Sequence, residues 1–429
     1  MKGTFAIVTL GCKTNQFEST AMAEQLEQAG FGQVEFSSGA ALVIVNTCTV
    51  TAATDSQSRN LIRRARRLNP SCRVVVTGCY AQVDPCALEN LLEVDLVLGN
   101  EEKADLLHWL NTDGPKVRVG DIRQARGVSF DLNSFGSRSR AFVQIQNGCD
   151  AFCSYCIIPH ARGPSRSALP EQILEQVSKF CMAGFPEIVL TGIHVGGFGN
   201  DLQPPSNLAT LVRRLLESTE VRRLRIGSIE PLELSTELIE LVAQSERLCP
   251  HFHIPLQAGD DGILKAMNRH YSVDYFRGLI QDIKARLPDA AIGLDVITGF
   301  PGETEQAFVN TMNLITELPV SHLHVFPFSR RPGTPAATMG QQVPGDVARQ
   351  RAAQLRTLGE TKQRLYAQRF VGRHLDVVVE GKKRNGWRNG LSKHYLPVSF
   401  AAPADFDRRS VTVEILESRE EGLLGRLVD

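Results

Sequence analysis

The feature that most constrains the fold of this 429-residue chain is a repeated alternation of short apolar segments with longer amphipathic segments. Continuous apolar runs are typical of parallel strands that helices cover on both faces. The first apolar runs are residues 5–10, 41–45, 74–76 and 95–98, and residues 18–29 and 58–68 between them have a helical pattern. The pattern predicts an α/β fold that begins with a small doubly wound parallel sheet.

A second series of such segments begins near residue 140. Its strand-like runs are residues 141–145, 187–190, 224–226, 251–254, 292–297 and 322–326. Stretches such as 170–183 and 208–218 between them are predicted helices. Because a seventh and eighth strand are lacking, the series predicts a partial (β/α)6 barrel of the TIM type. Residues 111–138, rich in Gly, Asp, Ser and Arg, predict a linker before it.

The end of the chain has a third character. A polar, helical connector is predicted at residues 345–373 and is followed by short strand-like runs at 375–380, 396–400, 411–416 and 423–424. Short strands separated by Gly and polar turns indicate a small β-barrel. We therefore expect three domains, with bounds 1–125, 135–365 and 368–429.

Composition narrows the class of protein. Hydrophobic residues make up 42% and charged residues 22% of the chain, which is ordinary for a globular protein and excludes a disordered or fibrous one. Lys+Arg and Asp+Glu are 47 each, but this balance does not argue against nucleic acid, because local basic patches bind phosphate. Neither a signal peptide nor a membrane span is evident, so we expect a cytoplasmic protein.

Ten cysteines in a reducing compartment favour metal ligation over disulfides. The strongest motif is CDAFCSYC at residues 149–156, which follows the first barrel strand. Three thiolates at this spacing can hold three irons of a 4Fe-4S cluster and leave the fourth iron open. The alternative is a zinc knuckle with a distant fourth ligand such as His160.

A second set of three cysteines follows the first three strands of the predicted N-terminal sheet. Cys12, Cys48 and Cys79 each come directly after an apolar run. Because the carboxyl ends of parallel strands meet at one edge, we expect these thiols to converge. The remaining four cysteines are interpreted as small core residues: Cys72, Cys86, Cys181 and Cys249. The alternative for Cys72 and Cys86, which flank Cys79 in the sequence, is that one of them replaces Cys79 as a ligand.

The motif at 149–156, at the head of a partial barrel, resembles the radical S-adenosylmethionine (SAM) superfamily. In that superfamily the open iron binds SAM, and one-electron reduction cleaves SAM to a radical. The resemblance implies that the ligands of this cluster are catalytic: Cys149, Cys153 and Cys156. It also implies SAM contacts at the ends of two later strands: Thr191, Gly192, Ser228 and Glu230.

The segments around the other triad resemble a narrower family, the methylthiotransferases. They read GCKTNQ at 11–16, NTCTVT at 46–51 and TGCYAQ at 77–82. The resemblance implies that Cys12, Cys48 and Cys79 hold a second, auxiliary 4Fe-4S cluster, so that the cofactors are two 4Fe-4S clusters and SAM. It covers the whole chain: a methylthiotransferase N-terminal domain, a radical SAM core and a module similar to the RNA-binding TRAM domain.

Within this family, residues 11–16, 46–51 and LHVFPFSR at 323–330 resemble the branch that acts on threonylcarbamoyladenosine in tRNA. The resemblance implies transfer of a methylthio group to carbon 2 of that base, with one SAM methylating a sulfur atom at the auxiliary cluster and another supplying the radical. The alternatives are the isopentenyladenosine tRNA branch and the branch that modifies a ribosomal-protein aspartate. The implied partners are the tRNA anticodon stem-loop and an electron donor such as flavodoxin or ferredoxin, and we expect a monomer.

Basic residues form two acid-free stretches. One contains six arginines between Asp55 and Asp84, and the other, residues 381–404, contains KKRNGWR at 382–388. Cations beside Trp387 and Tyr395 are typical of phosphate contact with base stacking, although a solvated charged face is the alternative. The predicted substrate and RNA contacts are Arg330, Lys382, Lys383, Arg384 and Arg388. A buried threonylcarbamoyl carboxylate needs a cation, for which Arg330 and Arg331 are candidates. Arg330 is preferred because it matches the family's position.

Overall fold

The computed structural model describes residues 3–128, 132, 135–136, 138–382, 386–403, 406 and 409–428, without the side chain of Lys382. The chain forms two compact units, each made of several segments. The first contains residues 1–136, 144–168 and 329–337, and the second contains residues 137–143, 169–328 and 338–429. Both cysteine triads therefore belong to the first unit. Within the described part of the chain, no helix combines the length and apolarity that a membrane crossing needs.

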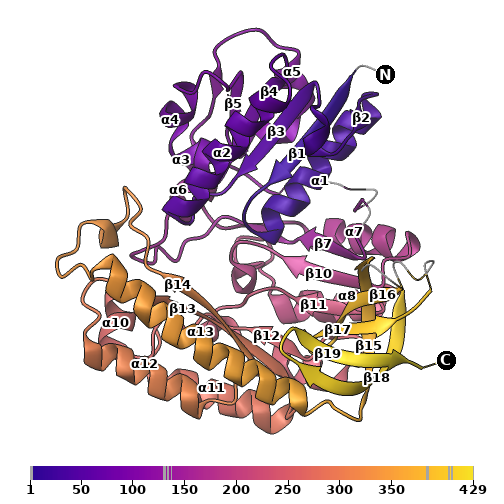
Figure 1. Ribbon diagram of the computed structural model, residues 1–429, viewed down its shortest axis with the longest axis vertical. Coiled ribbons are helices and arrows are strands. Elements are labelled where there is room, and N and C mark those ends of the chain that lie inside the picture. Colours follow the sequence, from indigo (N-terminus) through magenta and orange to yellow (C-terminus); the bar gives the residue numbers. More distant parts are fainter. Residues whose placement is uncertain are drawn as a thin grey trace. The chain divides into compact units, whose positions relative to one another are not determined.

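The first unit is built on a parallel sheet in the order β2-β1-β3-β4-β5-β6. Its strands are β1 (Thr4–Thr9), β2 (Gly32–Gln33), β3 (Leu42–Thr47), β4 (Arg73–Gly78), β5 (Leu96–Leu98) and β6 (Val117–Arg118). Its helices are α1 (Lys13–Gln28), α2 (Ala52–Leu68), α3 (Cys79–Val83), α4 (Pro85–Glu89), α5 (Leu106–Leu110) and α6 (Ile158–Arg162). Figure 1 shows helices on both sides of the sheet.

Two separate cores confirm the doubly wound prediction. Val43 and Val45 pack with Ile62 of α2 in one core, whereas Ile44 packs with Met22 of α1 in the other. Alternate residues of β3 thus point to opposite faces, as a strand covered on both sides requires. The predicted linker at 111–138 is partly wrong, because Val117 pairs with Val97 and adds the edge strand β6. A strand of two residues is too short to leave a periodic pattern.

The second unit contains the predicted half-barrel. Its strands are β7 (Arg140–Gln144), β10 (Glu187–Thr191), β11 (Leu224–Ile226), β12 (His251–His253), β13 (Ala291–Thr298) and β14 (His322–Pro327). They form two three-stranded sheets, β11-β10-β7 and β12-β13-β14, and parallel bridges such as Ser228 to His253 link the two. All six predicted barrel strands are therefore confirmed.

Helices cover the outer side of these strands. They are α7 (Pro170–Met182), α8 (Leu208–Ser218), α9 (Thr236–Gln244), α10 (Asp261–Ala266), α11 (Val273–Arg286) and α12 (Glu305–Glu317). Five of them begin at a side-chain cap that accepts a backbone N–H: Asn207, Ser235, Asp260, Ser272 and Thr304. Such caps fix where each helix starts, and hence hold the loops that follow the strands in place.

The chain ends in a closed five-stranded barrel, in the order β15-β16-β17-β19-β18, which confirms the third predicted element. The strands are β15 (His374–Lys382), β16 (Trp387–Ser392), β17 (Pro397–Ala401), β18 (Ser410–Arg419) and β19 (Gly422–Leu427), and α13 (Gly345–Gln368) precedes them. The sequence did not predict β16, because the polar and glycine-containing WRNGLS lacks clear alternation. Val377 and Phe400 of this barrel share one apolar core with Ala291 of the half-barrel and with Phe370, which follows α13.

The half-barrel and the small barrel also share a buried ion network. Glu187 on β10 accepts hydrogen bonds from Arg223 (2.5 Å) and Arg225 (2.8 Å), and all three side chains are inaccessible or nearly so. The same guanidinium groups donate to the carbonyl oxygens of Leu391 and Ser392 on β16. The carbonyl oxygens at the end of β16 therefore accept hydrogen bonds from guanidinium groups that are buried in the half-barrel. The small barrel is thus an integral part of the second unit.

Candidate functional site

The first cysteine triad lies at the carboxyl edge of the N-terminal sheet. Cys12 caps the start of α1 after β1, Cys48 follows β3, and Cys79 begins α3 directly after β4. Because β1, β3 and β4 are adjacent parallel strands in register, the three residues leave the sheet side by side, as predicted. The pKa of the Cys48 thiol is raised to about 11. Burial is the main cause, and the neighbouring Cys79 and Cys12 thiols add to it.

Asn15 holds two of these loops together. Its Nδ2 donates to Leu10 O (2.7 Å) and to Thr47 O (3.0 Å), the carbonyls that precede Cys12 and Cys48 in their loops. The chain at Gly11 has φ +93°, and a Cβ there would lie 2.9 Å from Cys48 Sγ. Only glycine combines this left-handed backbone with so close an approach, so the sequence Gly11-Cys12 brings the two thiols near each other.

A fully buried charge network lies beneath this triad. Arg162, at the end of α6, donates from Nε to Cys79 Sγ at 3.2 Å, and its other nitrogens bind Glu18 and Asn15. Lys103, in a short 3-10 turn (Glu102–Asp105), donates to Glu18 Oε2 at 2.5 Å. The side chains of Glu18, Lys103 and Arg162 are all 0–1% exposed. The network joins α1 and α6 to Cys79 at the start of α3.

This network brings a cation to the sulfur of Cys79. Burial disfavours the charge on Arg162, yet the sulfur of Cys79 and the carboxylate of Glu18 raise the pKa of Arg162 well above its usual value. Burial also opposes ionisation of Glu18, but Arg162 and Lys103 outweigh it and lower the pKa of Glu18. Burial lowers the pKa of Lys103, so Arg162 is the cation that a thiolate ligand at Cys79 would meet. Cysteine sulfur in this form is the ligand that iron–sulfur clusters use.

The second triad lies between β8 (Gln146–Asn147) and α6. Cys149 N donates to Gly163 O (3.1 Å), and Cys156 N donates to Cys153 O (2.9 Å), so backbone bonds curl the loop. Gly148, with φ +73°, precedes Cys149, and a Cβ there would lie 1.8 Å from Pro164 O. This loop ends in the helix that carries Arg162, so the two triads are connected through one helix.

The other cysteines divide into three environments. Cys72 and Cys249 are buried, and Cys72 belongs to a sheet core, as predicted. Cys181 is half-buried on α7. Cys86 is exposed on α4, so its interpretation as a core residue is wrong. A five-residue helix at the surface has one buried position here, and Leu88 occupies it.

The residues predicted to contact SAM lie at the ends of β10 and β11, which are neighbouring parallel strands. Thr191 is the last residue of β10, and Gly192 follows it. Ser228 is exposed, and its Oγ donates to His253 O at 3.4 Å. Glu230 forms an ion pair with Arg269, in which Arg269 Nη1 lies 3.1 Å from Glu230 Oε1. Burial raises the pKa of the Glu230 carboxyl.

Residues 329–337 belong to the first unit, where they bind the segment that follows Cys48. Arg331 is buried and donates to Thr49 Oγ1 (2.7 Å) and Asp55 Oδ2 (2.6 Å), and Ser329 Oγ accepts from Ala52 N (3.1 Å). Arg330 between them is exposed. The structure thus uses Arg331 in an ion pair and holds Arg330 at the surface near the loop of the first triad.

The predicted RNA contacts are only partly within the described residues. Lys383 and Arg384 lie outside them, as does the side chain of Lys382. Arg388 is buried and donates to Pro403 O at 3.0 Å, which leaves it inaccessible to a phosphate in this conformation. Tyr395 is likewise unsuited to base stacking, because its ring packs on His251 at a centroid distance of 4.3 Å.

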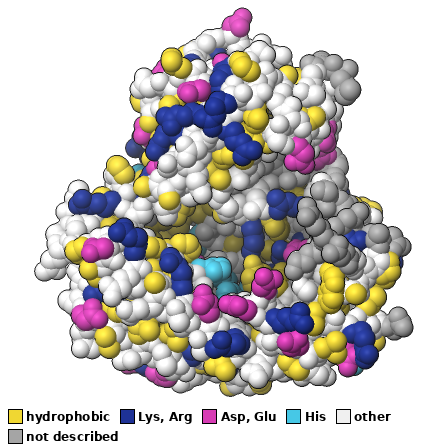
Figure 2. All heavy atoms as spheres, viewed as in Figure 1, with side chains coloured by type: hydrophobic (Ala, Val, Ile, Leu, Met, Phe, Trp, Pro, Cys, Tyr) yellow, Lys and Arg dark blue, Asp and Glu magenta, His cyan; other side chains and the backbone are white. Residues whose placement is uncertain are grey.

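Two other features match the expected nucleic-acid partner. Trp387 is 39% exposed and lines a hollow on the small barrel together with Arg419. On the first unit, Arg63, Arg64 and Arg67 are exposed on α2. Figure 2 shows Lys and Arg side chains gathered where Figure 1 draws this helix.

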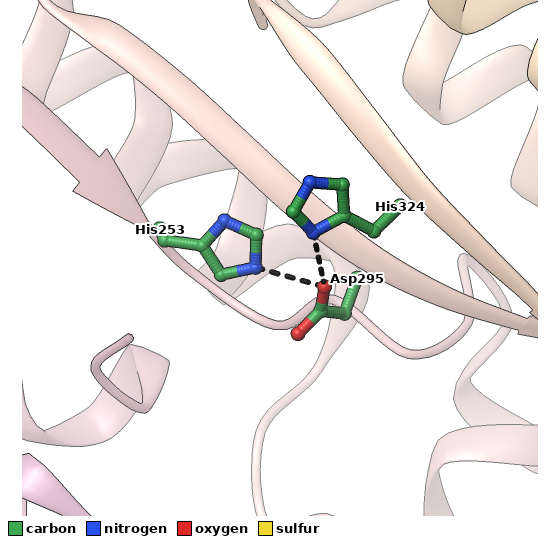
Figure 3. Close-up of side chains that lie close together, drawn as sticks. All are labelled: His253, Asp295 and His324. Atoms are coloured by element: carbon green, nitrogen blue, oxygen red, sulfur yellow. Dashed lines mark hydrogen bonds and ion pairs between the residues drawn. The ribbon is translucent and has the colours of Figure 1, made fainter. Parts of the chain in front are cut away.

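Sequence reasoning missed a polar cluster on the half-barrel strands. His253 of β12 and His324 of β14 both approach Asp295 of β13, and Figure 3 shows the two rings converging on one carboxylate oxygen. The available signal was a His-x-His repeat in two strands, at His251 and His253 and again at His322 and His324.

Known proteins resemble the chain along its whole length. Residues 4–99 match the uncharacterized protein family UPF0004, and residues 143–315 match the radical SAM superfamily. The threonylcarbamoyladenosine tRNA methylthiotransferase MtaB of Bacillus subtilis strain 168 is 39% identical over 99% of this chain and 97% of its own. The MtaB protein of Rickettsia prowazekii strain Madrid E is 42% identical over 87% of each chain.

A solved structure shares the fold. The radical SAM methyltransferase TsrM from Kitasatospora setae, with cobalamin and a 4Fe-4S cluster bound, superposes with a TM-score of 0.55. The similarity covers 79% of this chain and 77% of that chain at 17% sequence identity, and so concerns the fold alone.

Proposed function

Because this chain belongs to the radical SAM methylthiotransferase family, in its threonylcarbamoyladenosine tRNA branch, we propose that it transfers a methylthio group to carbon 2 of that base in tRNA. The observation that carries the proposal is the contact between Arg162 and Cys79. It links the helix after one cysteine triad to a cysteine of the other, within one compact unit. An enzyme that joins a radical to a sulfur group needs both centres in one molecule.

The cofactors are two 4Fe-4S clusters and SAM. Cys149, Cys153 and Cys156 would hold the first cluster, and Cys12, Cys48 and Cys79 the auxiliary one. Clusters with an open iron supply an electron for SAM cleavage and a site for the sulfur that is transferred. Carbon 2 of adenine carries no acidic hydrogen, so a side-chain base cannot activate it and a radical is required.

The chain's own residues have positioning roles in this proposal. Thr191, Gly192 and Ser228 would contact SAM from the ends of β10 and β11. Glu230 would accept a hydrogen bond from a sugar hydroxyl, and its ion pair with Arg269 holds the carboxylate in place. Arg162 would donate to the ligated sulfur of Cys79.

Substrate recognition is proposed for two regions. Exposed Arg330 would pair with the carboxylate of the threonylcarbamoyl group, supported by the fact that its neighbour Arg331 is already used by Asp55. Lys382, Lys383 and Arg384 would contact the phosphates of the anticodon stem-loop, and the exposed Trp387, which follows in the sequence, would stack on a base. We assign these roles to a methylthiotransferase N-terminal domain at 1–125, a radical SAM core at 135–365 and a TRAM-like domain at 368–429.

The further partners follow from the chemistry. SAM cleavage needs a low-potential electron, for which a flavodoxin or ferredoxin is suitable. We propose that the enzyme acts as a monomer in the cytoplasm, where tRNA is modified.

Mass spectrometry of tRNA nucleosides tests the function. Cells that lack the protein should lose the methylthio form of threonylcarbamoyladenosine and accumulate the unmethylthiolated base, and the chain should restore it. The purified enzyme should act on tRNA that carries threonylcarbamoyladenosine and leave isopentenyladenosine tRNA unchanged. Methylthiolation of the isopentenyl substrate, or of a ribosomal protein in place of tRNA, would contradict the branch assignment.

A further inference from the structure

We propose that His253, Asp295 and His324 form a binding site for one divalent transition-metal ion of the zinc class, separate from both cysteine triads. His253 Nε2 lies 2.8 Å from Asp295 Oδ1, and His324 Nδ1 lies 3.3 Å from the same oxygen. The three ligand atoms all lie within 4.8 Å of one another. The proposal does not rest on the methylthiotransferase function.

The sheet register explains why these side chains meet. β12, β13 and β14 are adjacent parallel strands, with His253 paired to Gly293 and Asp295 paired to His324. Side chains alternate along a strand, so His253, Asp295 and His324 point to the same face. Because rigid strands carry all three donors, their arrangement does not depend on a loop.

The distances suit a small metal ion. Zinc binds histidine nitrogen at about 2.0–2.1 Å and carboxylate oxygen at about 2.0–2.2 Å, so ligand atoms of a tetrahedral site lie roughly 3.3 Å apart. The observed separations from Asp295 Oδ1, 2.8 and 3.3 Å, are close to this spacing. Two histidines with one carboxylate also leave coordination positions open, an arrangement typical of reactive or substrate-binding metal sites.

The charge of the cluster favours a cation over an anion. Both ion-pair partners of Asp295 in the structure are imidazoles, which can coordinate a metal through a neutral nitrogen lone pair. An anionic ligand would meet the Asp295 carboxylate at the centre of the cluster. A divalent ion instead compensates the carboxylate and uses the converging nitrogens.

The surroundings give the site a closed side and an open side. His322 lies next to the cluster, with ring centroids 5.9 Å from His253 and 5.5 Å from His324, and Tyr395 stacks on His322 at 5.6 Å. In contrast, the His324 side chain is 49% exposed, compared with 12% for His253. An ion can therefore enter beside His324, and an oxygen-donor ligand can reach it there.

Gly293 makes room for the rings. A Cβ at this position would lie 2.8 Å from His253 Nδ1 and 2.1 Å from His322 Nε2. Gly293→Ala should therefore displace the imidazoles without removing a ligand atom, which provides a second way to perturb the site.

Metal analysis of the anaerobically reconstituted enzyme tests the proposal. The protein is incubated with a small excess of Zn²⁺, passed through a desalting column, and assayed for zinc and iron per chain. We expect about one zinc per chain in the wild type, and at least a tenfold weaker retention in Asp295→Asn, His324→Gln and Gly293→Ala at unchanged iron content. The matched control His270→Gln alters an exposed histidine that is not a member of the cluster, and it should retain the zinc.

Equal zinc in the wild type and in the three variants, at matched iron, would overturn the proposal and identify the cluster as a hydrogen-bonded one. Zinc that is lost only together with iron would also overturn it, because the ion would then reside in the cysteine sites.

Discussion

At the scale of single residues, a small group of buried charges connects the first unit to its cysteines. Glu18, Lys103 and Arg162 are fully buried, and Arg162 donates a hydrogen bond to the sulfur of Cys79. An unpaired buried charge is strongly destabilising, so this network favours the ligated state of the cysteine.

Replacing Arg162 tests this interpretation. Arg162→Gln should remove about 3–5 kcal/mol of stability from the first unit, because Glu18 and Cys79 lose a buried cation. The reconstituted protein should hold fewer irons than the roughly eight of two 4Fe-4S clusters, with the loss confined to the auxiliary cluster. Iron analysis and electron paramagnetic resonance measure this.

A neighbouring arginine provides the control. Arg166 is also nearly buried and pairs with Glu101 at 2.7 Å, with no cysteine among its hydrogen-bond partners in the described structure. Arg166→Gln should lower stability but keep the iron content. An Arg162→Gln protein with both clusters intact would refute the role of this residue.

Two adjacent arginines should differ in their effects. Arg330→Ala should raise the KM for threonylcarbamoyladenosine tRNA and leave the melting temperature unchanged, because Arg330 is exposed. Arg331→Ala should instead lower stability by about 1–3 kcal/mol, because it leaves the half-buried Asp55 without its ion-pair partner. Kinetics with modified tRNA, together with SAM cleavage in the absence of RNA, separates the two effects. Identical behaviour of both variants would exclude a substrate role for Arg330.

His394 makes stability depend on pH. Burial lowers its pKa to about 4; Arg373, Arg225 and Lys393 lower it as well, whereas Asp289 acts in the opposite direction. In the unfolded chain its pKa is about 6.5, so below that pH the unfolded state binds a proton that the folded state rejects. Its contribution to stability is complete above about pH 6.5 and decreases as the pH falls toward 4.

The variant His394→Gln should therefore lose less stability than the wild type on acidification. Urea unfolding of the full chain, followed by circular dichroism at about pH 7.5 and about pH 5, measures the difference. His374→Gln, at an exposed position on β15, should behave like the wild type. Parallel pH curves for wild type and His394→Gln would show that the imidazole is not responsible.

At the scale of elements, apolar runs in the sequence predicted the strands whose own residues are apolar. The strands β1, β3 and β4 and all six half-barrel strands were correctly predicted, and the convergence of Cys12, Cys48 and Cys79 followed from parallel strand ends. The short strands β6 and β16 were missed because pairing with a neighbour, and not their own sequence, stabilises them. The burial of Arg388 depends on the same kind of tertiary contact, since its acceptor is Pro403 O.

The strand β16 also alters what truncation should do. Removal of residues 370–429 would take away Leu391 O and Ser392 O, which accept from the arginines that pair with Glu187. The truncated chain should therefore melt at a lower temperature and lose SAM cleavage as well as RNA binding. A truncated protein with full stability and full SAM cleavage would contradict this structural role.

Point substitutions are the better probe of RNA binding. Replacing Lys382, Lys383 and Arg384 together by Ala should weaken tRNA binding and reduce the slope of log affinity against log salt by about 2–3, because fewer counterions are released. The melting temperature should stay unchanged, and a binding titration at several salt concentrations measures the slope. An unaltered slope would show that this stretch does not contact phosphate.

At the scale of the whole molecule, the first unit gathers both triads and residues 329–337 from distant parts of the chain. Sequence alone could identify the two triads but not this grouping. Arg162 and Arg331, which hold the segments together, are single polar residues without a pattern of their own. Their partners could be found only from the folded structure.

The grouping predicts an asymmetry between the two clusters. Replacing Cys149, Cys153 and Cys156 by Ala should leave about four irons and a stable protein, because the Arg162 network keeps Cys79. Replacing Cys12, Cys48 and Cys79 should also leave about four irons, but with lower stability, because the buried Arg162 then loses the sulfur that accepts its Nε hydrogen bond. Adding Arg162→Gln to this second variant should cost less stability than Arg162→Gln costs in the wild type, since the bond to Cys79 is already lost there. Iron analysis and thermal unfolding of the three proteins test the argument, and loss of both clusters from one folded triple variant would show that the sites are not independent.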